Sequence, residues 1–163
     1  MKKIILAMVA VMVPLMLSAG STDFWFRHFS VEDGLSSSAV RAIMQDKYGF
    51  MWLGTDDGLN RYDGTTIKIY RLNPEGVNDY ISFLYDTTDR IWIGTGDGVY
   101  IYDYETENFE PFKLLTAKGD SIKTNVNHIA EDRDGNLWFS TVGQGIFKYN
   151  VSKHYLERYE FKD

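Results

Sequence analysis

The sequence has 163 residues, of which 44% are hydrophobic and 15% aromatic, so it can build about one domain with a substantial core. Its 23 acidic residues outnumber its 17 basic ones, and this net charge of −6 argues against binding to nucleic acid or to anionic membrane surfaces. The chain has no cysteine, which excludes disulfides and thiol chemistry.

Residues 1–20 have the pattern of a secretory signal peptide. Lys2 and Lys3 precede an apolar run from Ile4 to Leu17, and Ser18-Ala19-Gly20 supplies the small residues of a cleavage site. The run is shorter than the roughly 20 residues that a membrane-spanning helix needs, so we expect no stable membrane span in the mature chain. An exported chain without cysteine fits the bacterial periplasm.

Residues 21–38 are expected to form an outer strand and a lead-in segment. Phe24 to Ser30 (FWFRHFS) has the same aromatic and basic composition as the last strand of each four-stranded repeat described below. We therefore predict that it is the last strand of an adjoining repeat unit, or blade. The polar stretch from Val31 to Ser38 (VEDGLSSS) then leads into the first repeat.

An internal repeat dominates the remaining chain. The segments DKYGFMWLGTDDGLNRYD, DTTDRIWIGTGDGVYIYD and DRDGNLWFSTVGQGIFKYN contain Trp52, Trp92 and Trp138, which are 40 and then 46 residues apart. Repeats of this period are typical of β-propellers and other repeat arrays.

Each repeat divides into four short strands separated by glycine-rich or aspartate-rich turns. We therefore predict an all-β chain, a partial propeller of three four-stranded antiparallel blades (39–73, 74–115 and 116–163) plus the N-terminal strand. The predicted strands are Val40–Gln45, Met51–Thr55, Leu59–Asp63 and Thr66–Arg71; Tyr80–Tyr85, Arg90–Thr95, Val99–Tyr104 and Asn108–Lys113; and Val126–Glu131, Leu137–Thr141, Ile146–Asn150 and Tyr155–Phe161.

The three tryptophans occupy the same place in the second strand of each repeat. They could stack on a sugar, but regular recurrence favours rings packed between blades, and we predict that Trp52, Trp92 and Trp138 form the blade core.

Aspartate and glycine recur at the turns, where aspartate can bond backbone N–H groups and glycine can adopt a positive φ. Calcium binding is the alternative, since Asp132-x-Asp134-x-Asn136 is like the start of an EF-hand loop, but Leu137 and Gly143 stand where that loop needs Gly and Glu. We therefore expect no metal and no cofactor. The predicted turn-fixing residues are Asp46, Gly49, Asp57, Gly58, Asp86, Asp97, Gly98, Asp132, Gly135 and Gly145.

The pattern W-[LI]-G-T-x-D-G-[LV]-x-x-Y-D after a GLSSSAV segment resembles the two-component regulator propeller repeat. The matching segments are Gly34 to Val40, Trp52 to Asp63 and Trp92 to Asp103, with a weaker match from Trp138 to Asn150, and the resemblance covers residues 24–163. It implies the periplasmic sensor region of a hybrid two-component system typical of Bacteroidetes, whose ligands are commonly oligosaccharides. Such sensors continue into further blades and a histidine kinase, so we expect this chain to be the front end of one, without an output domain.

The resemblance implies a binding module rather than an enzyme, with an oligosaccharide as the possible ligand. A propeller glycosidase or lyase, or a protein-interaction module, remains open as an alternative. As further partners we expect additional blades, or copies of this chain associating through open blade edges. Polar or aromatic residues in the connections between blades are the candidate ligand contacts, namely Asn73, Asn78, Tyr80, Asn125, Asn127 and His128.

Overall fold

A computed structural model of the chain describes residues 25–72 and 80–160. This part of the chain contains one 3-10 turn, η1 (Val31–Asp33), and three antiparallel sheets of four strands each. The predicted signal peptide and residues 73–79, with Asn73 and Asn78, lie outside the described residues.

Each sheet is a meander in which consecutive strands are hydrogen-bonded neighbours. Blade 1 comprises β1 (Val40–Gln45), β2 (Met51–Thr55), β3 (Gly58–Tyr62) and β4 (Ile67–Tyr70). Blade 2 comprises β5 (Ile81–Asp86), β6 (Arg90–Thr95), β7 (Gly98–Asp103) and β8 (Phe109–Pro111). Blade 3 comprises β9 (Val126–Glu131), β10 (Leu137–Thr141), β11 (Gly145–Asn150) and β12 (Tyr155–Tyr159).

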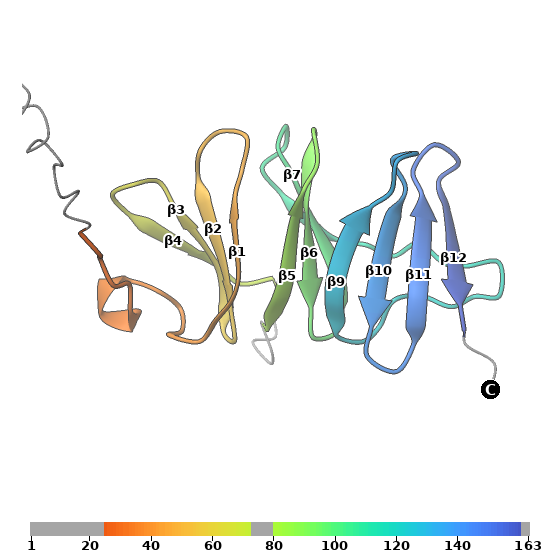
Figure 1. Cartoon of the computed structure of the whole chain (residues 1–163), viewed down its shortest axis with the longest axis horizontal. Helices are drawn as coiled ribbons and strands as arrows, with labels where there is room; N and C mark the ends of the chain where they lie inside the picture. The colour runs from red at the N-terminus through yellow and green to blue at the C-terminus, as the bar shows by residue number, and fades with distance from the viewer. Residues whose placement is uncertain (1–24, 73–79, 161–163) are drawn as a thin grey trace, which may run out of the picture.

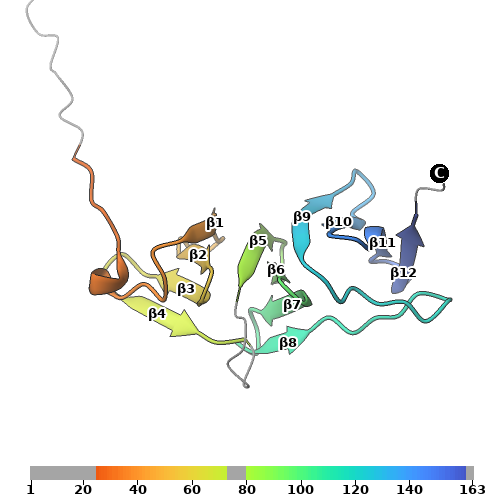
Figure 2. The same ribbon diagram turned by 90° about the horizontal axis from the view of Figure 1, so that it is seen from below.

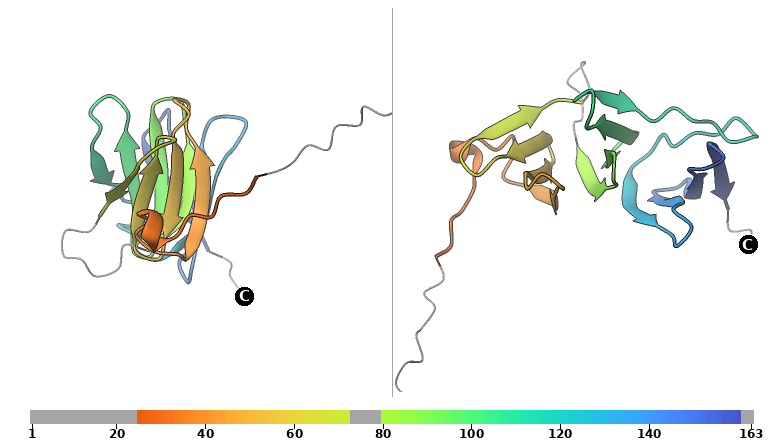
Figure 3. Two further views of the ribbon diagram at one scale, coloured as in Figure 1. Left: turned by 90° about the vertical axis from the view of Figure 1, so that its left-hand side faces the viewer. Right: turned by 90° about the horizontal axis from the view of Figure 1, so that it is seen from above.

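The three blades form a fan (Figures 1 and 2). The first strands of the blades, β1, β5 and β9, lie side by side on the inner side of the fan, and β4, β8 and β12 lie on its outer side. The two further views show the same arc of sheets, with the N-terminal segment leaving blade 1 at the outer end of the fan (Figure 3). The predicted fold class, a partial propeller of four-stranded antiparallel blades, is confirmed.

The predicted strands agree closely with the observed ones. β1, β2, β6, β9 and β10 have the predicted bounds, and the others differ by one or two residues at an end. The alternation of buried and exposed residues with the intervening turn residues was therefore sufficient to place every strand of the three blades.

The N-terminal segment differs from its prediction. Residues 25–30 belong to no strand, and Trp25 and Phe26 are 93% and 88% exposed. A strand needs a partner with a free edge, and in the described chain this segment runs away from blade 1 rather than along a sheet edge (Figure 1). Ser30 then caps η1 in a capping box with Asp33, which turns the chain into blade 1.

The hydrophobic core is divided between the two blade junctions. At the junction of blades 1 and 2, Trp52 and Leu59 pack with Ile81, Ile91 and Tyr102. At the junction of blades 2 and 3 the equivalent cluster is built from Trp92 and Val99 with Val126, Phe139, Phe147 and Tyr149. Because each blade buries its apolar face against the next, the blades stabilise one another as in other repeat arrays.

The three repeat tryptophans differ in burial, because a further blade packs against only the first two in the described chain. The exposed fraction of Trp52 is 0% and that of Trp92 is 3%, whereas Trp138 is half-buried. Trp52 contacts the Tyr102 ring of blade 2 at 5.1 Å, and Trp92 contacts the Tyr149 ring of blade 3 at 5.7 Å. Trp138 contacts Tyr159 and Lys148 of its own blade, and no ring of another described blade covers it.

Candidate functional site

The inner strands share an irregularity at the same place. The register of each strand against its neighbour shifts by one residue near its start, which inserts a β-bulge. The bulged residues are Arg41 in β1, Ser82 in β5 and Asn127 in β9. A β-bulge re-aims a side chain and is frequent beside functional sites, so the three inner strands each present one polar residue at a common level.

The residue before each inner strand is equally well fixed. The carbonyl oxygens of Ala39, Tyr80 and Asn125 accept hydrogen bonds from the N–H groups of Asp56, Gly96 and Val142, at 3.2, 3.1 and 2.9 Å. These three residues occupy one structural position, yet their side chains are a methyl group, a phenol and an amide. Together with the bulged residues and His128 they form what we call the inner rim (Ala39, Arg41, Tyr80, Ser82, Asn125, Asn127 and His128).

The inner rim is variable where the blade scaffold is constant. Trp, Thr and the turn glycines recur in every blade because each blade needs them for folding. At the same position the inner rim has side chains as different as Ala39, Tyr80 and Asn125, which are partly exposed. A ligand that lay across the rim would therefore meet a different group on each blade.

Blade 1 contributes a charged pair to the inner rim. The Arg41 guanidinium donates to both carboxylate oxygens of Asp56, at 2.6 and 2.9 Å, and it lies over the Tyr80 ring at 5.9 Å. The hydrogen bond from Arg41 holds the pKa of Asp56 below its usual value, so this carboxylate stays ionised and paired.

Blades 2 and 3 contribute uncharged polar groups. The Ser82 hydroxyl donates to the Val126 carbonyl at 2.6 Å, and the Phe83 ring lies 4.3 Å from the imidazole of His128. Asn127 and His128 are exposed. The side-chain oxygen of Asn125 is buried and has no hydrogen-bond partner among the described residues. A buried acceptor without a partner is rare in proteins.

The structure thus brings together four of the six predicted ligand contacts. Tyr80, Asn125, Asn127 and His128 all lie at the inner rim, while Asn73 and Asn78 are outside the described residues. Sequence reasoning missed Arg41 and Ser82. What distinguishes these two residues is the β-bulge, which becomes visible only when the strands are paired.

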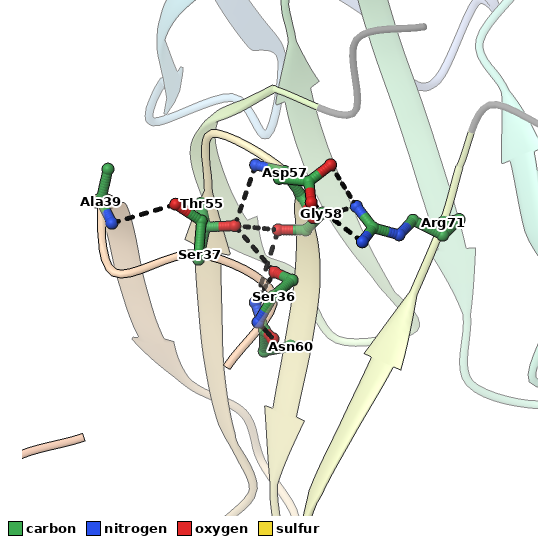
Figure 4. A network of polar contacts seen from close by, with 8 residues as sticks. All are labelled: Ser36, Ser37, Ala39, Thr55, Asp57, Gly58, Asn60 and Arg71. Carbon is green, nitrogen blue, oxygen red and sulfur yellow. Dashed lines mark hydrogen bonds and ion pairs between the residues drawn. The ribbon is translucent and has the colours of Figure 1, made fainter. Parts of the chain in front are cut away.

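The Ser-rich lead-in has a structural role, which Figure 4 shows. Ser36 donates its N–H to the Asn60 side-chain oxygen at 2.9 Å, accepts from the Asn60 amide at 2.8 Å, and bonds the Thr55 hydroxyl at 2.9 Å. Asn60 and Thr55 are fully buried. The network satisfies these buried polar groups and anchors the lead-in to the second turn of blade 1, so it is not free for a ligand.

The predicted turn residues also have structural roles. Asp57 pairs with Arg71 and Asp97 accepts from the Thr95 hydroxyl at 2.7 Å. The predicted glycines all have positive φ, between 77° and 146°; they are Gly49, Gly58, Gly98, Gly135 and Gly145. At Gly98 a side chain would also meet the Ile122 carbonyl oxygen at 2.9 Å, so both conformation and space require glycine there.

Asp46 and Asp132 each tie a turn to the tryptophan of their blade. The Asp46 carboxylate accepts the Trp52 indole N–H at 2.8 Å and the N–H groups of Tyr48 and Phe50. The Asp132 carboxylate accepts the Trp138 indole N–H at 2.9 Å and bonds from Asn136.

Asp86 does not have this turn-fixing role. It ends β5, where it pairs with Ile91, and its carboxylate accepts the Tyr104 hydroxyl at 2.8 Å. Burial is the largest cause of its raised pKa. The turn of blade 2 begins at Thr87 instead and is one residue shorter than the turns that begin at Asp46 and Asp132. Asp86 and Asp46 lie equally far before the tryptophans of their blades, so sequence spacing aligned them. Because the turn of blade 1 has one residue more, their positions in the strand and turn nevertheless differ by one residue.

The described residues contain no group of three or more His, Asp or Glu side chains arranged to hold a metal ion. They also contain no helix that is long and apolar enough to cross a membrane. What the inner rim offers is hydrogen-bond donors and acceptors, the Arg41–Asp56 ion pair and the rings of Tyr80 and His128.

The chain matches a known family model in two of its three blades. The model described as two-component regulator propeller matches residues 34–57 and 121–143, which cover the lead-in, β1 and β2 of blade 1 and the corresponding segments of blade 3. The structure is similar to the extracellular domain of BT3049 from B. thetaiotaomicron, named as a hybrid two-component system, with a TM-score of 0.72 and 30% identity. The extracellular domain of BT4673 from the same organism shares the fold, with a TM-score of 0.64 and 24% identity.

These proteins are much longer than the chain. The similarity to BT3049 covers 82% of this chain and 20% of that one, and the similarity to BT4673 covers 86% and 21%. A curated relative, histidine kinase P4 of Formosa agariphila, is 56% identical over 59 residues, which are 36% of this chain and 4% of that protein. The chain therefore spans about a fifth of the solved domains and a small part of the curated relative.

Proposed function

We propose that the chain is part of a periplasmic sensory propeller that binds a carbohydrate at the inner rim, since the two-component regulator propeller model matches residues 34–57 and 121–143. The similarity to extracellular domains of proteins named as two-component systems supports the sensory role and the location outside the cytoplasmic membrane. In this proposal the signal passes to a kinase region like that of the curated relative.

The chemistry of the inner rim supports a hydroxyl-rich ligand. The observation that carries the proposal is the gathering of Asn127 and His128, both exposed, with Tyr80 at one end of the inner strands. The amide of Asn127 and the imidazole of His128 can each donate or accept, and Tyr80 supplies an aromatic face. An uncharged ring with many hydroxyl groups satisfies all of these groups without bringing a charge into the site.

The same site is better suited to binding than to glycoside hydrolysis. That reaction uses two carboxyl groups, one as an acid and one as a base or nucleophile. Asp56, the carboxylate paired at the inner rim, is held by two guanidinium nitrogens of Arg41. A carboxylate kept ionised in this way is a poor proton donor.

Oligosaccharide binding tests this proposal. The full chain is screened on an immobilised glycan array, and the best glycan is titrated calorimetrically against Asn127→Ala and His128→Ala. Both residues are exposed, so their loss should leave folding intact and weaken binding by about tenfold each, the worth of one to two hydrogen bonds. Asn108→Ala, an exposed asparagine at the opposite end of blade 2, is the matched control and should bind as the wild type does. An array without a retained glycan, or equal affinity in all three variants, contradicts the proposal.

A further inference from the structure

The two blade junctions are closed differently at the end opposite the inner rim. This end carries the turns between the first and second strands and between the third and fourth strands of each blade. Both junctions have the same floor, a buried tryptophan against a buried tyrosine of the next blade, Trp52 with Tyr102 and Trp92 with Tyr149. The groups above this floor differ between them.

Large side chains fill the first junction. The Tyr104 ring packs against the Tyr48 ring at 5.2 Å, and the Lys47 ammonium lies 4.3 Å from the centre of the Tyr104 ring. The Tyr104 hydroxyl donates to the Asp86 carboxylate at 2.8 Å. The space above Trp52 is therefore occupied, and the carboxylate at its edge is satisfied.

The second junction lacks each of these filling groups. The turn of blade 2 is one residue shorter than that of blade 1, and Thr88 and Asp89 follow its first residue where the larger Lys47 and Tyr48 follow Asp46 in blade 1. Val151 lies two residues after Tyr149, as Tyr104 lies two residues after Tyr102, so a valine stands in the place of the tyrosine.

A hollow of about 460 Å³ results above Trp92. This volume lies within the range of small-molecule sites. Leu137 and Tyr149 form the floor with Trp92, and Thr88, Glu131 and His154 stand at the edge.

The electrostatics of the hollow are acidic. Arg90 is paired with the neighbouring carboxylate of Asp89, at 3.0 and 2.8 Å, so this pair adds no net charge. Glu131 occupies the position of Asp86 and accepts from the Tyr85 hydroxyl at 3.1 Å. Among the described residues no cationic side chain pairs with Glu131, so its charge is uncompensated.

His154 closes one side of the hollow. Its Nδ1 is 2.8 Å from the Tyr149 hydroxyl, and the two rings meet edge to face at 5.8 Å. This contact orients the imidazole at the edge of the hollow beside the aromatic floor. A carboxylate next to aromatic rings is the combination that recognises organic ammonium groups, through charge pairing and the negative faces of the rings.

We propose that the hollow between blades 2 and 3 binds a small ligand that carries a primary ammonium group, with Glu131 as its counter-ion and Trp92, Leu137 and Tyr149 beneath its apolar part. The site lies at the other end of the blades from the inner rim. It does not depend on the carbohydrate-binding function proposed above.

The test uses two probes that share a ring and differ in charge. Cyclohexylamine, which is cationic at neutral pH, and cyclohexanol, which is not, are titrated separately into the isotopically labelled full chain, and amide chemical shifts are followed by NMR. We expect cyclohexylamine to shift residues 87–90, 131–137 and 149–154 with a roughly millimolar dissociation constant, and to leave the turns of blade 1 unchanged. The absence of shifts in these three segments, or equal shifts with cyclohexanol, overturns the proposal.

Two variants test whether binding depends on the charge of Glu131 and on the empty space beside Val151. Glu131→Gln removes the charge at constant shape and should weaken cyclohexylamine binding by about tenfold. Val151→Tyr restores the ring that fills the first junction and should abolish binding while Glu131 is retained. Glu32→Gln removes an equal charge from the exposed η1 turn and should bind as the wild type does. Undiminished binding of cyclohexylamine to Glu131→Gln or to Val151→Tyr contradicts the proposal. If either variant does not fold, the comparison of cyclohexylamine with cyclohexanol on the wild type still tests the proposal.

Discussion

Asp132 illustrates how a single residue links a turn to the core of its blade. Its carboxylate accepts the Trp138 indole N–H at 2.9 Å, two bonds from the Asn136 amide nitrogen at 3.0 Å, and the backbone N–H of Asn136. These bonds favour the ionised form and hold the pKa of Asp132 well below its ordinary value, with the indole bond as the largest cause. The folded state therefore binds this proton more weakly than the unfolded state does.

This difference predicts the pH dependence of stability. A carboxyl whose pKa is depressed by folding adds stability above its unfolded pKa, near 4, and the stability is lost as the pH falls toward the folded value. We expect the melting temperature of the wild type to fall as the pH is lowered from about 5 to 2. In Asp132→Asn this fall should be shallower, because the variant has no proton to take up at this position.

The control is Asp134→Asn, which changes an exposed aspartate of the same turn whose side chain makes no described bond. Its pH profile should follow that of the wild type. Identical acid profiles for the wild type and Asp132→Asn would show that the Asp132 carboxylate does not have the role assigned to it.

At the scale of elements, close approach between blades decides which residues are tolerated. Gly54 of β2 faces the first strand of blade 2, and a Cβ atom there would lie 2.5 Å from Ile81 Cγ2 and 2.9 Å from Ile81 Cβ. At Gly94, the equivalent of Gly54 in β6, the nearest atoms are 3.2 Å away. Blade 3 has Ser140 at this position, where the described chain places no following blade.

These distances predict an order of effects. Gly54→Ala should lower the free energy of unfolding by about 1–3 kcal/mol, the typical cost of overpacking a core. Gly94→Ala should cost less, because its neighbours need to move by only a few tenths of an ångström. Ser140→Ala, the control at the same position of blade 3, should have little effect. Chemical denaturation of the three variants measures the order, and an equal cost for Gly54→Ala and Ser140→Ala would contradict it.

The elements also show what the sequence could and could not predict. Local alternation and turn residues determine a strand, so β1, β2, β6, β9 and β10 were placed with their observed bounds. The hollow above Trp92 was not predicted, since it arises from the pairing of two blades. The sequence nevertheless contains the signal for it. Val151 in blade 3 replaces Tyr104 of blade 2, and the turn of blade 2 is shorter than the turn of blade 1 that carries Lys47 and Tyr48.

At the scale of the whole molecule, the fan has an uncovered flank at blade 3. Trp138 packs against Tyr159 of its own blade at 5.6 Å with the two rings tilted, and Trp52 stacks on Tyr70 at 5.8 Å. Trp52 is covered in addition by Tyr102 and another ring of blade 2. The described chain provides no such cover for Trp138, and an exposed apolar surface of this kind favours association.

We therefore predict that the chain without the predicted signal peptide, residues 21–163, associates reversibly in solution. Sedimentation velocity at rising concentration should show a shift from monomer to larger species. The double variant Trp138→Ser with Tyr159→Ser removes the two rings of the flank, and it should weaken association by about tenfold or more, since each buried aromatic ring is worth about 1.5–3 kcal/mol. Leu115→Ser, a change at a residue that is 56% exposed in the connection between blades 2 and 3, is the control and should associate as the wild type does. A wild type that sediments as a monomer at every concentration and melts cooperatively at high temperature would show that the flank of blade 3 is stable in water.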